Sequence, residues 1–263
     1  MFTSAPHSES VVVVSPDRIV RALAAVVCLL VGVSCLGQVS KFFLGHDHLF
    51  GLIRLTYLNG EATIPAWYSS SALLLCAGAL AVVASAKRSR GDRWSRYWVG
   101  LALLFVYLSA DESAGIHELW GKGIKDRFAP TGFFLFAWVI PGMIAVLAIG
   151  LAYLKFLWNL PAETRRAFIL AGCVFVGGAL GVEMLGAKHL SIVGVHNFTH
   201  SLLITLEEAA EMFGVLILLH AVLQHLATEC GVALVEIRAA ERPVTGRQVV
   251  ASTNRATVIA GGW

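Results

Sequence analysis

The chain has 263 residues, of which 57% are hydrophobic and only 14% are charged, and its formal net charge at pH 7 is +3. Its mean hydropathy is +0.73, whereas about a quarter of the residues in a typical soluble domain are charged. This composition excludes an ordinary water-soluble globular domain and indicates an integral membrane protein.

Six apolar stretches are long enough to cross a bilayer as helices, because about 20 residues span the hydrocarbon core. The predicted fold class is therefore all-α integral membrane, a bundle of six transmembrane helices. We expect an amino-terminal cytoplasmic segment at 1–17, a transmembrane domain at 18–228 with an outer loop at 45–66, and a mostly disordered cytoplasmic tail at 229–263. The six predicted spans cover residues 19–44, 67–86, 97–120, 132–158, 167–187 and 195–226.

Basic residues gather in the connections on one side of these spans. Residues 87–96 hold five Lys or Arg, Arg165 and Arg166 lie in another connection, and Arg18 and Arg21 flank the first span. Cytoplasmic loops carry an excess of such residues, so we expect both termini in the cytoplasm. The clusters indicate orientation in a membrane and not binding to nucleic acid. The opposite connections hold fewer basic residues, namely Arg54, Lys122, Lys125, Arg127 and Lys188.

The first outer connection, residues 45–66, is long for a turn and mixes apolar with polar residues. We expect it to form a short interfacial helix or cap, with Trp67 and Tyr68 at the depth of the lipid headgroups.

The third predicted span carries Asp111, Glu112, His117 and Glu118 in the stretch LSADESAGIHELW. Asp111 and Glu118 are seven residues apart and therefore share one face of a continuous helix, with Glu112 and His117 flanking it.

The fifth span carries Glu183, and Gly172, Val176 and Ala179 precede it on the same helical face. Small residues there predict close packing against another helix.

The sixth span is the most polar of the long apolar stretches. His196, His200, Glu207 and Glu211 fall within a wedge of roughly 60° on a helix, and Glu208 lies on its flank. Two further histidines, His220 and His225, lie toward the cytoplasmic end, and we interpret them as structural or interfacial.

A carboxylate in hydrocarbon costs several kcal/mol unless it is paired, protonated or bound to a cation. The first, second and fourth spans have no interior acidic residue, so we expect the third, fifth and sixth to face inward and the others to be more exposed to lipid. No Lys or Arg lies at the depth of the carboxylates, which leaves shared protons or a bound cation to neutralise them.

Carboxylates mixed with imidazoles favour a divalent zinc, iron or manganese ion as this cation. The alternative is that the polar residues only hold helices together by hydrogen bonds. The candidate metal ligands are Asp111, Glu112, His117, Glu118, Glu183, His196, His200, Glu207, Glu208 and Glu211.

Three blocks together resemble an uncharacterised family of bacterial multi-spanning inner-membrane proteins. These blocks are NGEATIPAWYSS at 59–70, LSADESAGIHE at 108–118 and LEEAAEMFG at 206–214. The resemblance implies a location in the bacterial inner (cytoplasmic) membrane and brings no activity with it. It also suggests that Asn59, Glu61, Pro65 and Trp67 cap the polar cluster, the alternative being a turn followed by an interfacial aromatic belt.

The leading hypothesis is a metal-dependent membrane enzyme, a hydrolase or an oxidoreductase, that acts on a lipid-like substrate reaching the site from the outer leaflet. Glu112 and Glu208 are the candidate catalytic residues, one of them a general base toward a metal-bound water or oxygen species. One alternative is a proton- or cation-coupled transporter or channel, in which the same carboxylates titrate along a path. Another is a structural subunit of a membrane complex.

Overall fold

The computed structural model describes residues 15–46, 51–60 and 62–231, and every regular element in these residues is a helix. The all-α prediction is thereby confirmed for this part of the chain. Most of the predicted terminal segments, 1–17 and 229–263, lie outside the described residues. The elements are α1 (Pro16–Phe43), α2 (Leu52–Leu55), α3 (Ile64–Ser89), α4 (Ser95–Ala114), α5 (Ile116–Phe128), the 3-10 helix η2 (Gly132–Phe134), α6 (Val139–Asn159), α7 (Ala162–Val176), the π-helix η3 (Gly177–Val182), α8 (Glu183–Val193) and α9 (Phe198–Thr228).

Four helices in the described residues are long and apolar enough to cross a membrane. They are α1, α3, α6 and the continuous run α7–η3–α8, and α4 together with α5 makes a fifth if this bent pair is one span. The chain is therefore a multi-pass membrane protein by length and composition. The sixth predicted span corresponds to α9, a helix of 31 residues that is not among these candidates.

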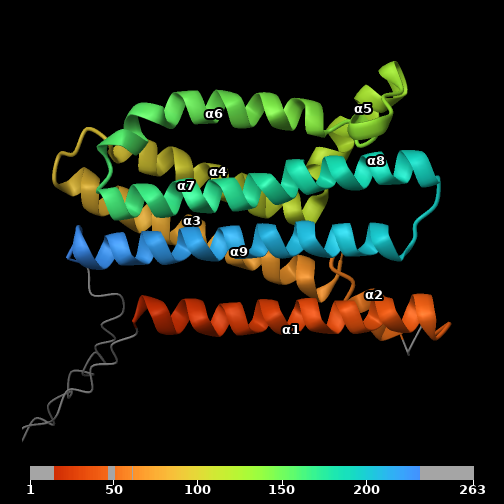
Figure 1. Ribbon diagram of the computed structural model, residues 1–263. Coiled ribbons are helices and arrows are strands. Elements are labelled where there is room, and N and C mark those ends of the chain that lie inside the picture. Colours follow the sequence, from red (N-terminus) through yellow and green to blue (C-terminus); the bar gives the residue numbers. More distant parts are fainter. Residues whose placement is uncertain (1–14, 47–50, 61, 232–263) are drawn as a thin grey trace, which may run out of the picture. The chain divides into compact units, whose positions relative to one another are not determined.

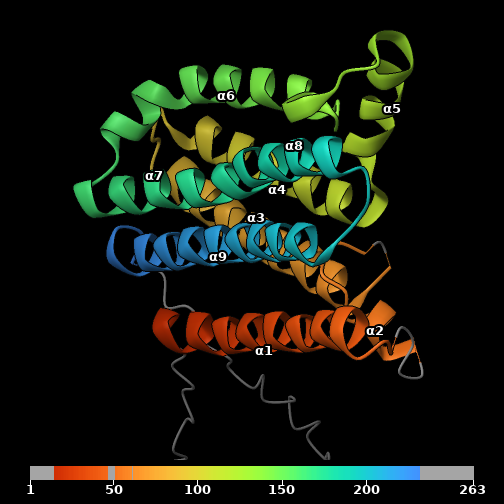
Figure 2. The same ribbon diagram turned by 45° about the vertical axis from the view of Figure 1, so that its right-hand side comes forward.

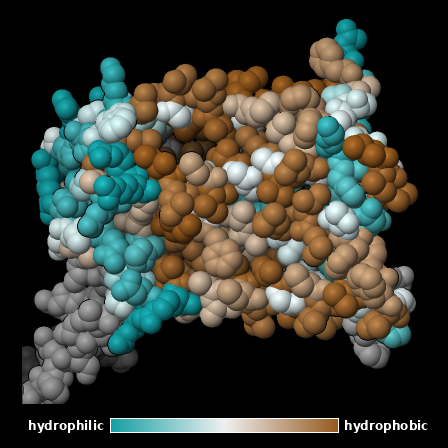
Figure 3. Space-filling view, viewed as in Figure 1, coloured by the Kyte–Doolittle hydropathy of each residue, from teal (hydrophilic) through white to brown (hydrophobic). Residues whose placement is uncertain are grey.

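The long helices between residues 15 and 231 run back and forth, with α9 packed against α1, α3 and α7 (Figures 1 and 2). The basic end of the bundle holds residues 87–96 and 155–166, and the loop end holds residues 51–60 and α5. Between the two ends the surface shown in Figure 3 is predominantly hydrophobic. Such a belt is the surface that a helical bundle presents to lipid.

The core forms where α9 meets α1 and α3. Leu219 and Val222 of α9, Leu80 and Val83 of α3 and Val27 of α1 are all fully buried. The prediction that the second span is among the more lipid-exposed ones is therefore wrong, because α3 packs most closely against α4 and also contacts α9. Helices α1 and α6 do expose many apolar side chains, as the sequence predicted for the first and fourth spans.

Helices α3 and α4 are joined by serines in the half nearer the loop end. The Ser70 hydroxyl donates to the Ser109 carbonyl at 2.8 Å, and the Ser109 hydroxyl donates to the Ser70 carbonyl at 2.8 Å. These reciprocal bonds fix the position of α4 along the axis of α3, just before the acidic residues of α4.

The predicted continuous span 97–120 is interrupted. Helix α4 ends at Ala114, and Gly115 adopts a left-handed conformation with φ 57° and ψ 38°. The axis of α5 is bent by 70° from that of α4. Glycine tolerates this conformation because it has no Cβ, which explains why the helix breaks at this residue.

The fifth span approaches α9 at a different glycine from the one predicted. Gly178, within the π-helix η3, makes the close approach to α9, whereas Gly172, on α7 before η3, does not. A Cβ on Gly178 would lie 2.9 Å from the Glu207 carbonyl oxygen, whereas one on Gly172 would meet nothing within 4 Å.

Candidate functional site

A cavity of about 1040 Å³ lies between α4, α6, the α7–η3–α8 run and α9. Its volume is at the upper end of the range of about 300–1000 Å³ found for ligand pockets. All ten candidate ligands predicted from the sequence line it, namely Asp111, Glu112, His117, Glu118, Glu183, His196, His200, Glu207, Glu208 and Glu211.

Five glutamates from three helices form what we call the acidic cluster, Glu112, Glu183, Glu207, Glu208 and Glu211. Glu112 comes from α4 and Glu183 from the start of α8, while the remaining three lie on α9, where spacings of three and four residues place them on neighbouring faces. They interact electrostatically with one another across the cavity. In the part of the chain that the structure describes, none of the five pairs with a Lys or Arg within 4.0 Å.

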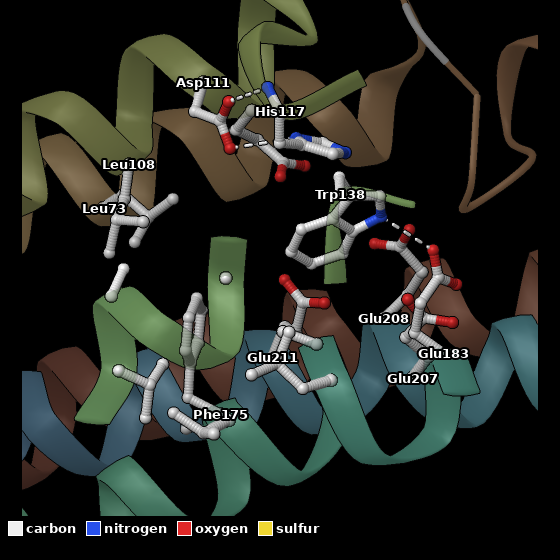
Figure 4. Close-up of a pocket in the computed structure, with 18 of the residues that line it drawn as sticks. Leu73, Leu108, Asp111, His117, Trp138, Phe175, Glu183, Glu207, Glu208 and Glu211 are labelled. Carbon is white, nitrogen blue, oxygen red and sulfur yellow. Dashed lines mark hydrogen bonds and ion pairs between the residues drawn. The ribbon is translucent and has the colours of Figure 1, made fainter. Parts of the chain in front are cut away.

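Glu183 is held by two neighbours. The indole Nε1 of Trp138, at the start of α6, donates to Glu183 Oε1 at 3.0 Å (Figure 4). The carboxyl groups of Glu183 and Glu207 also lie within hydrogen-bonding reach of each other. Two carboxyl groups can be joined in this way only if one of them carries a proton, because a carboxylate is purely an acceptor.

Asp111 and His117 form a separate pair at the break between α4 and α5. The backbone N–H of His117 donates to Asp111 Oδ1 at 2.7 Å, and its Nδ1 donates to Oδ2 at 2.9 Å (Figure 4). The imidazole also packs against the ring of Trp138, with the centroids 4.7 Å apart. These contacts show that both predicted ligands stabilise the bend beside the acidic cluster.

The histidines of the predicted site lie nearer the loop end than the carboxylates of α9. His200 is about two turns, or roughly 10 Å, from Glu207 along the helix. His196 is exposed and its ring centroid lies 4.6 Å from that of His200. Asn197 caps α9 by accepting from the His200 backbone N–H at 2.9 Å, and its Oδ1 also accepts from His189 Nε2 at 3.1 Å.

Among the described residues, no three His, Cys, Asp or Glu side chains are already positioned to hold a metal ion. Glu118 is exposed on α5 beyond the bend, so the shared face that the sequence predicted for Asp111 and Glu118 does not form. The break at Gly115 is the physical reason. The five glutamates of the acidic cluster offer carboxylate oxygens, which are the ligands that a hard divalent cation prefers.

The part of the cavity toward the basic end is apolar. Leu104, Phe105 and Ile149 are among the side chains that line it. It ends at an aromatic group in which Tyr97 stacks on Phe156 at 5.4 Å, and the Tyr153 hydroxyl donates to the Tyr97 carbonyl at 3.1 Å. The cavity is therefore acidic in one half and hydrocarbon-like in the other.

Helix α6 forms one wall of this cavity and is fixed mainly at its ends. Val139 and Phe156 are buried, whereas Leu147 and Leu151 between them are each 65% exposed. Its contacts with other helices are sparse and go mainly to α7 and η3. The middle of α6 thus separates the cavity from the surrounding lipid with little support from its neighbours.

Two residues near the acidic cluster were not predicted from the sequence. Trp138 was interpreted only as part of an apolar span, yet its N–H is the donor to Glu183. Tyr57 lies in the loop beyond α2, and burial, together with the nearby Glu208 and Glu207 carboxylates, raises the pKa of its hydroxyl. For Tyr57 the available signal was a donor-bearing aromatic residue in a connection that precedes the acidic spans, whereas the apolar surroundings of Trp138 in the sequence gave none.

The loop residues proposed as a cap divide into two groups. Asn59 lines the cavity and Pro65 is buried. Trp67 is 72% exposed, which fits the interfacial belt better than a cap. Glu61 lies outside the described residues. The short helix expected in this connection is α2, Leu52–Leu55.

A family model described as a domain of unknown function, DUF8692, matches residues 20–226. The chain belongs to DUF8692. The matched DUF8692 region includes α3 to α8, all five glutamates of the acidic cluster and most of α1 and α9. Comparison with curated proteins and with solved structures finds no match.

Proposed function

We propose that this DUF8692 protein is a metal-dependent integral membrane enzyme that acts on a lipid-like substrate. In this proposal six helices cross the bacterial inner membrane, with the basic end and both termini in the cytoplasm and the loop end outside. The observation that supports it best is the division of one cavity into the acidic cluster and an apolar half.

The division of the cavity matches an amphiphile. A polar head meets the carboxylates, and a hydrocarbon chain fills the half lined by Leu104, Phe105 and Ile149. The aromatic group around Phe156 lies at the end of this half nearest the basic end. A conduction path needs polar or hydrated groups along its whole length, so the apolar lining favours binding over transport through the cavity.

The acidic cluster supplies the groups that the chemistry requires. The proposed ion is zinc, iron or manganese, and when bound it activates water or oxygen for hydrolysis or oxidation. Glu112 and Glu208 approach from opposite walls of the cavity, on α4 and α9, and interact electrostatically. One of them is left to accept a proton as the general base while the remaining carboxylates hold the ion.

Elemental analysis of the purified protein tests this proposal. We expect one divalent metal to copurify near stoichiometrically, and Glu211→Ala to lower its content at least about tenfold, because it removes a ligand oxygen. Glu163→Ala is the matched control, since Glu163 is exposed at the start of α7. A folded wild-type protein that neither contains nor takes up zinc, iron or manganese would refute the metal-dependent enzyme.

A proton-coupled transporter is the second candidate, and the contact between Glu183 and Glu207 favours it. Two carboxyl groups in hydrogen-bonding reach can share and pass a proton. In this case Glu207→Gln would abolish proton flux in liposomes, and neither the wild-type protein nor the variant would contain metal. Proton flux at the level of protein-free liposomes would remove this alternative.

A further inference from the structure

We propose that the cavity takes a single-chain amphiphile whose head carries a positive charge, an amine or an ammonium group. The head lies in the acidic cluster and the chain points toward the basic end. This inference rests on the proposed function, because it names the substrate class of the same site.

The charge of the cavity is the first argument. Seven acidic residues line the cavity, the five glutamates, Asp111 and Glu118, and its basic lining residues include Lys122, Lys125 and His117, the last of which pairs with Asp111. Among the described residues neither lysine lies within 4.0 Å of a carboxylate. The acidic cluster therefore has no basic partner of its own, and a divalent ion would offset only part of its charge. A phosphate or carboxylate head would add to the negative charge at short range, whereas an ammonium head would offset it.

His200 gives an independent indication that a ligand occupies this cavity. Its side chain lines the cavity, is 2% exposed and has an Nδ1 without a hydrogen-bond partner among the described residues. A buried polar atom without a partner costs about 1–3 kcal/mol, so such atoms are usually satisfied. A Cβ on Gly186 would lie 3.7 Å from Nδ1, which is ordinary van der Waals contact, so the ring lies directly against α8. Any partner for this nitrogen must therefore come from the side of the ring that lines the cavity.

Trp138 adds a surface that suits a cation. Its indole ring lies between Glu211 and the carboxylates of Glu183 and Glu208 (Figure 4). An ammonium group near the face of an indole gains a cation–π interaction, and this interaction is strongest for tryptophan and where water is excluded. A neutral or anionic head gains nothing comparable from the ring.

The length of the apolar half fits one hydrocarbon chain. Glu112 and Tyr97 mark the two ends of this half on α4, and they are separated by roughly 22 Å at a rise of about 1.5 Å per residue. One leaflet of the hydrocarbon core is about 15 Å thick. The apolar half is therefore long enough to accommodate a chain that fills one leaflet, with space left before the aromatic group.

Binding of three probes with the same chain tests the inference, namely dodecylamine, dodecanol and dodecyl phosphate. Affinities are measured with the full-length protein in phosphatidylcholine nanodiscs, and protein-free nanodiscs correct for partitioning into lipid. We expect dodecylamine to bind at least about tenfold more tightly than dodecyl phosphate, with dodecanol between them. The variant carrying Glu208→Gln and Glu211→Gln should lose this ranking, whereas Glu163→Gln should keep it.

A second pair of variants tests the position of the chain. Gly172 lines the apolar half, and a Cβ added there would meet nothing within 4 Å, so Gly172→Phe fills the cavity without a backbone clash. It should weaken dodecylamine binding at least about tenfold. Gly32→Phe is the control, because Gly32 on α1 is equally unobstructed and does not line the cavity.

The outcomes separate this inference from the proposed function. Metal uptake together with equal or tighter binding of dodecyl phosphate overturns the inference and leaves the metal-dependent enzyme standing. Preference for dodecylamine in a protein that takes up no metal supports the inference and refutes the metal-dependent enzyme. Unchanged binding in Gly172→Phe also overturns the inference, because the chain would then lie elsewhere.

Discussion

Substitution of Gly178 by alanine should separate η3 from α9 and disturb the acidic cluster. The added Cβ would lie 2.9 Å from the Glu207 carbonyl oxygen, 3.0 Å from Ala210 Cβ and 3.4 Å from Glu211 Cγ. Ordinary contacts begin at 3.4 Å, so the two helices must move apart by about half an ångström. Such overpacking costs about 1–3 kcal/mol, and the better helix propensity of alanine returns at most about 1 kcal/mol.

The net expectation is a loss of about 1–2 kcal/mol of stability, or roughly 2–8 °C in the melting temperature. The assay is thermal unfolding of the purified protein in detergent, with metal content measured on the same samples. Gly172→Ala is the control on the neighbouring helix, and it should be neutral or slightly stabilising because a Cβ there meets nothing within 4 Å. Equal melting temperatures for the two variants would refute the close packing of η3 against α9.

Three further predictions concern other parts of the chain. Asp111→Ala removes both acceptors of His117, so it should lower the free energy of unfolding by about 1–2 kcal/mol and accelerate proteolysis in α5. Unchanged proteolysis would show that this pair does not hold the bend. His225→Phe should lower the free energy of unfolding by about 1–3 kcal/mol and leave metal content unaltered, because it removes the 3.3 Å hydrogen bond between His225 Nδ1 and the buried Thr164 hydroxyl; loss of metal would contradict its structural role. In a cysteine-free background, a membrane-impermeant maleimide applied to intact cells should label Arg54→Cys and not Ser89→Cys, and the reverse result would invert the proposed orientation.

The sequence predicted the helical class and the gathering of the polar residues because both depend on regular periodicity. Spacings of three, four and seven residues place Glu207, Glu208, Glu211 and His200 on adjoining faces of one helix whatever surrounds it. A carboxylate in an apolar span must also avoid lipid, which directs Glu183 toward the same interior.

The same assumption of regular periodicity explains the errors. One left-handed residue, Gly115, turns the chain by 70° and moves Glu118 to the surface. Gly178, within the π segment η3, makes the close contact with α9 that was predicted for the face of Gly172. The helical period does not reveal such interruptions, because glycine is compatible with both the regular helix and its break. The positions of Tyr57 and Trp138 depend on how a loop and a helix end fold back, which no local pattern specifies.

The sparse packing of α6 gives the surrounding lipid an influence over the cavity. With 21 residues, α6 is roughly 31 Å long and nearly matches the hydrocarbon core of about 30 Å, whereas α9 with 31 residues is roughly 46 Å long. A thinner or thicker bilayer must be accommodated by tilting or bending, and the helix with the fewest lateral contacts adjusts most easily. Because α6 is a wall of the cavity, the affinity for any occupant should vary with the acyl-chain length of the host lipid. Membrane thickness then becomes a determinant of what this protein binds.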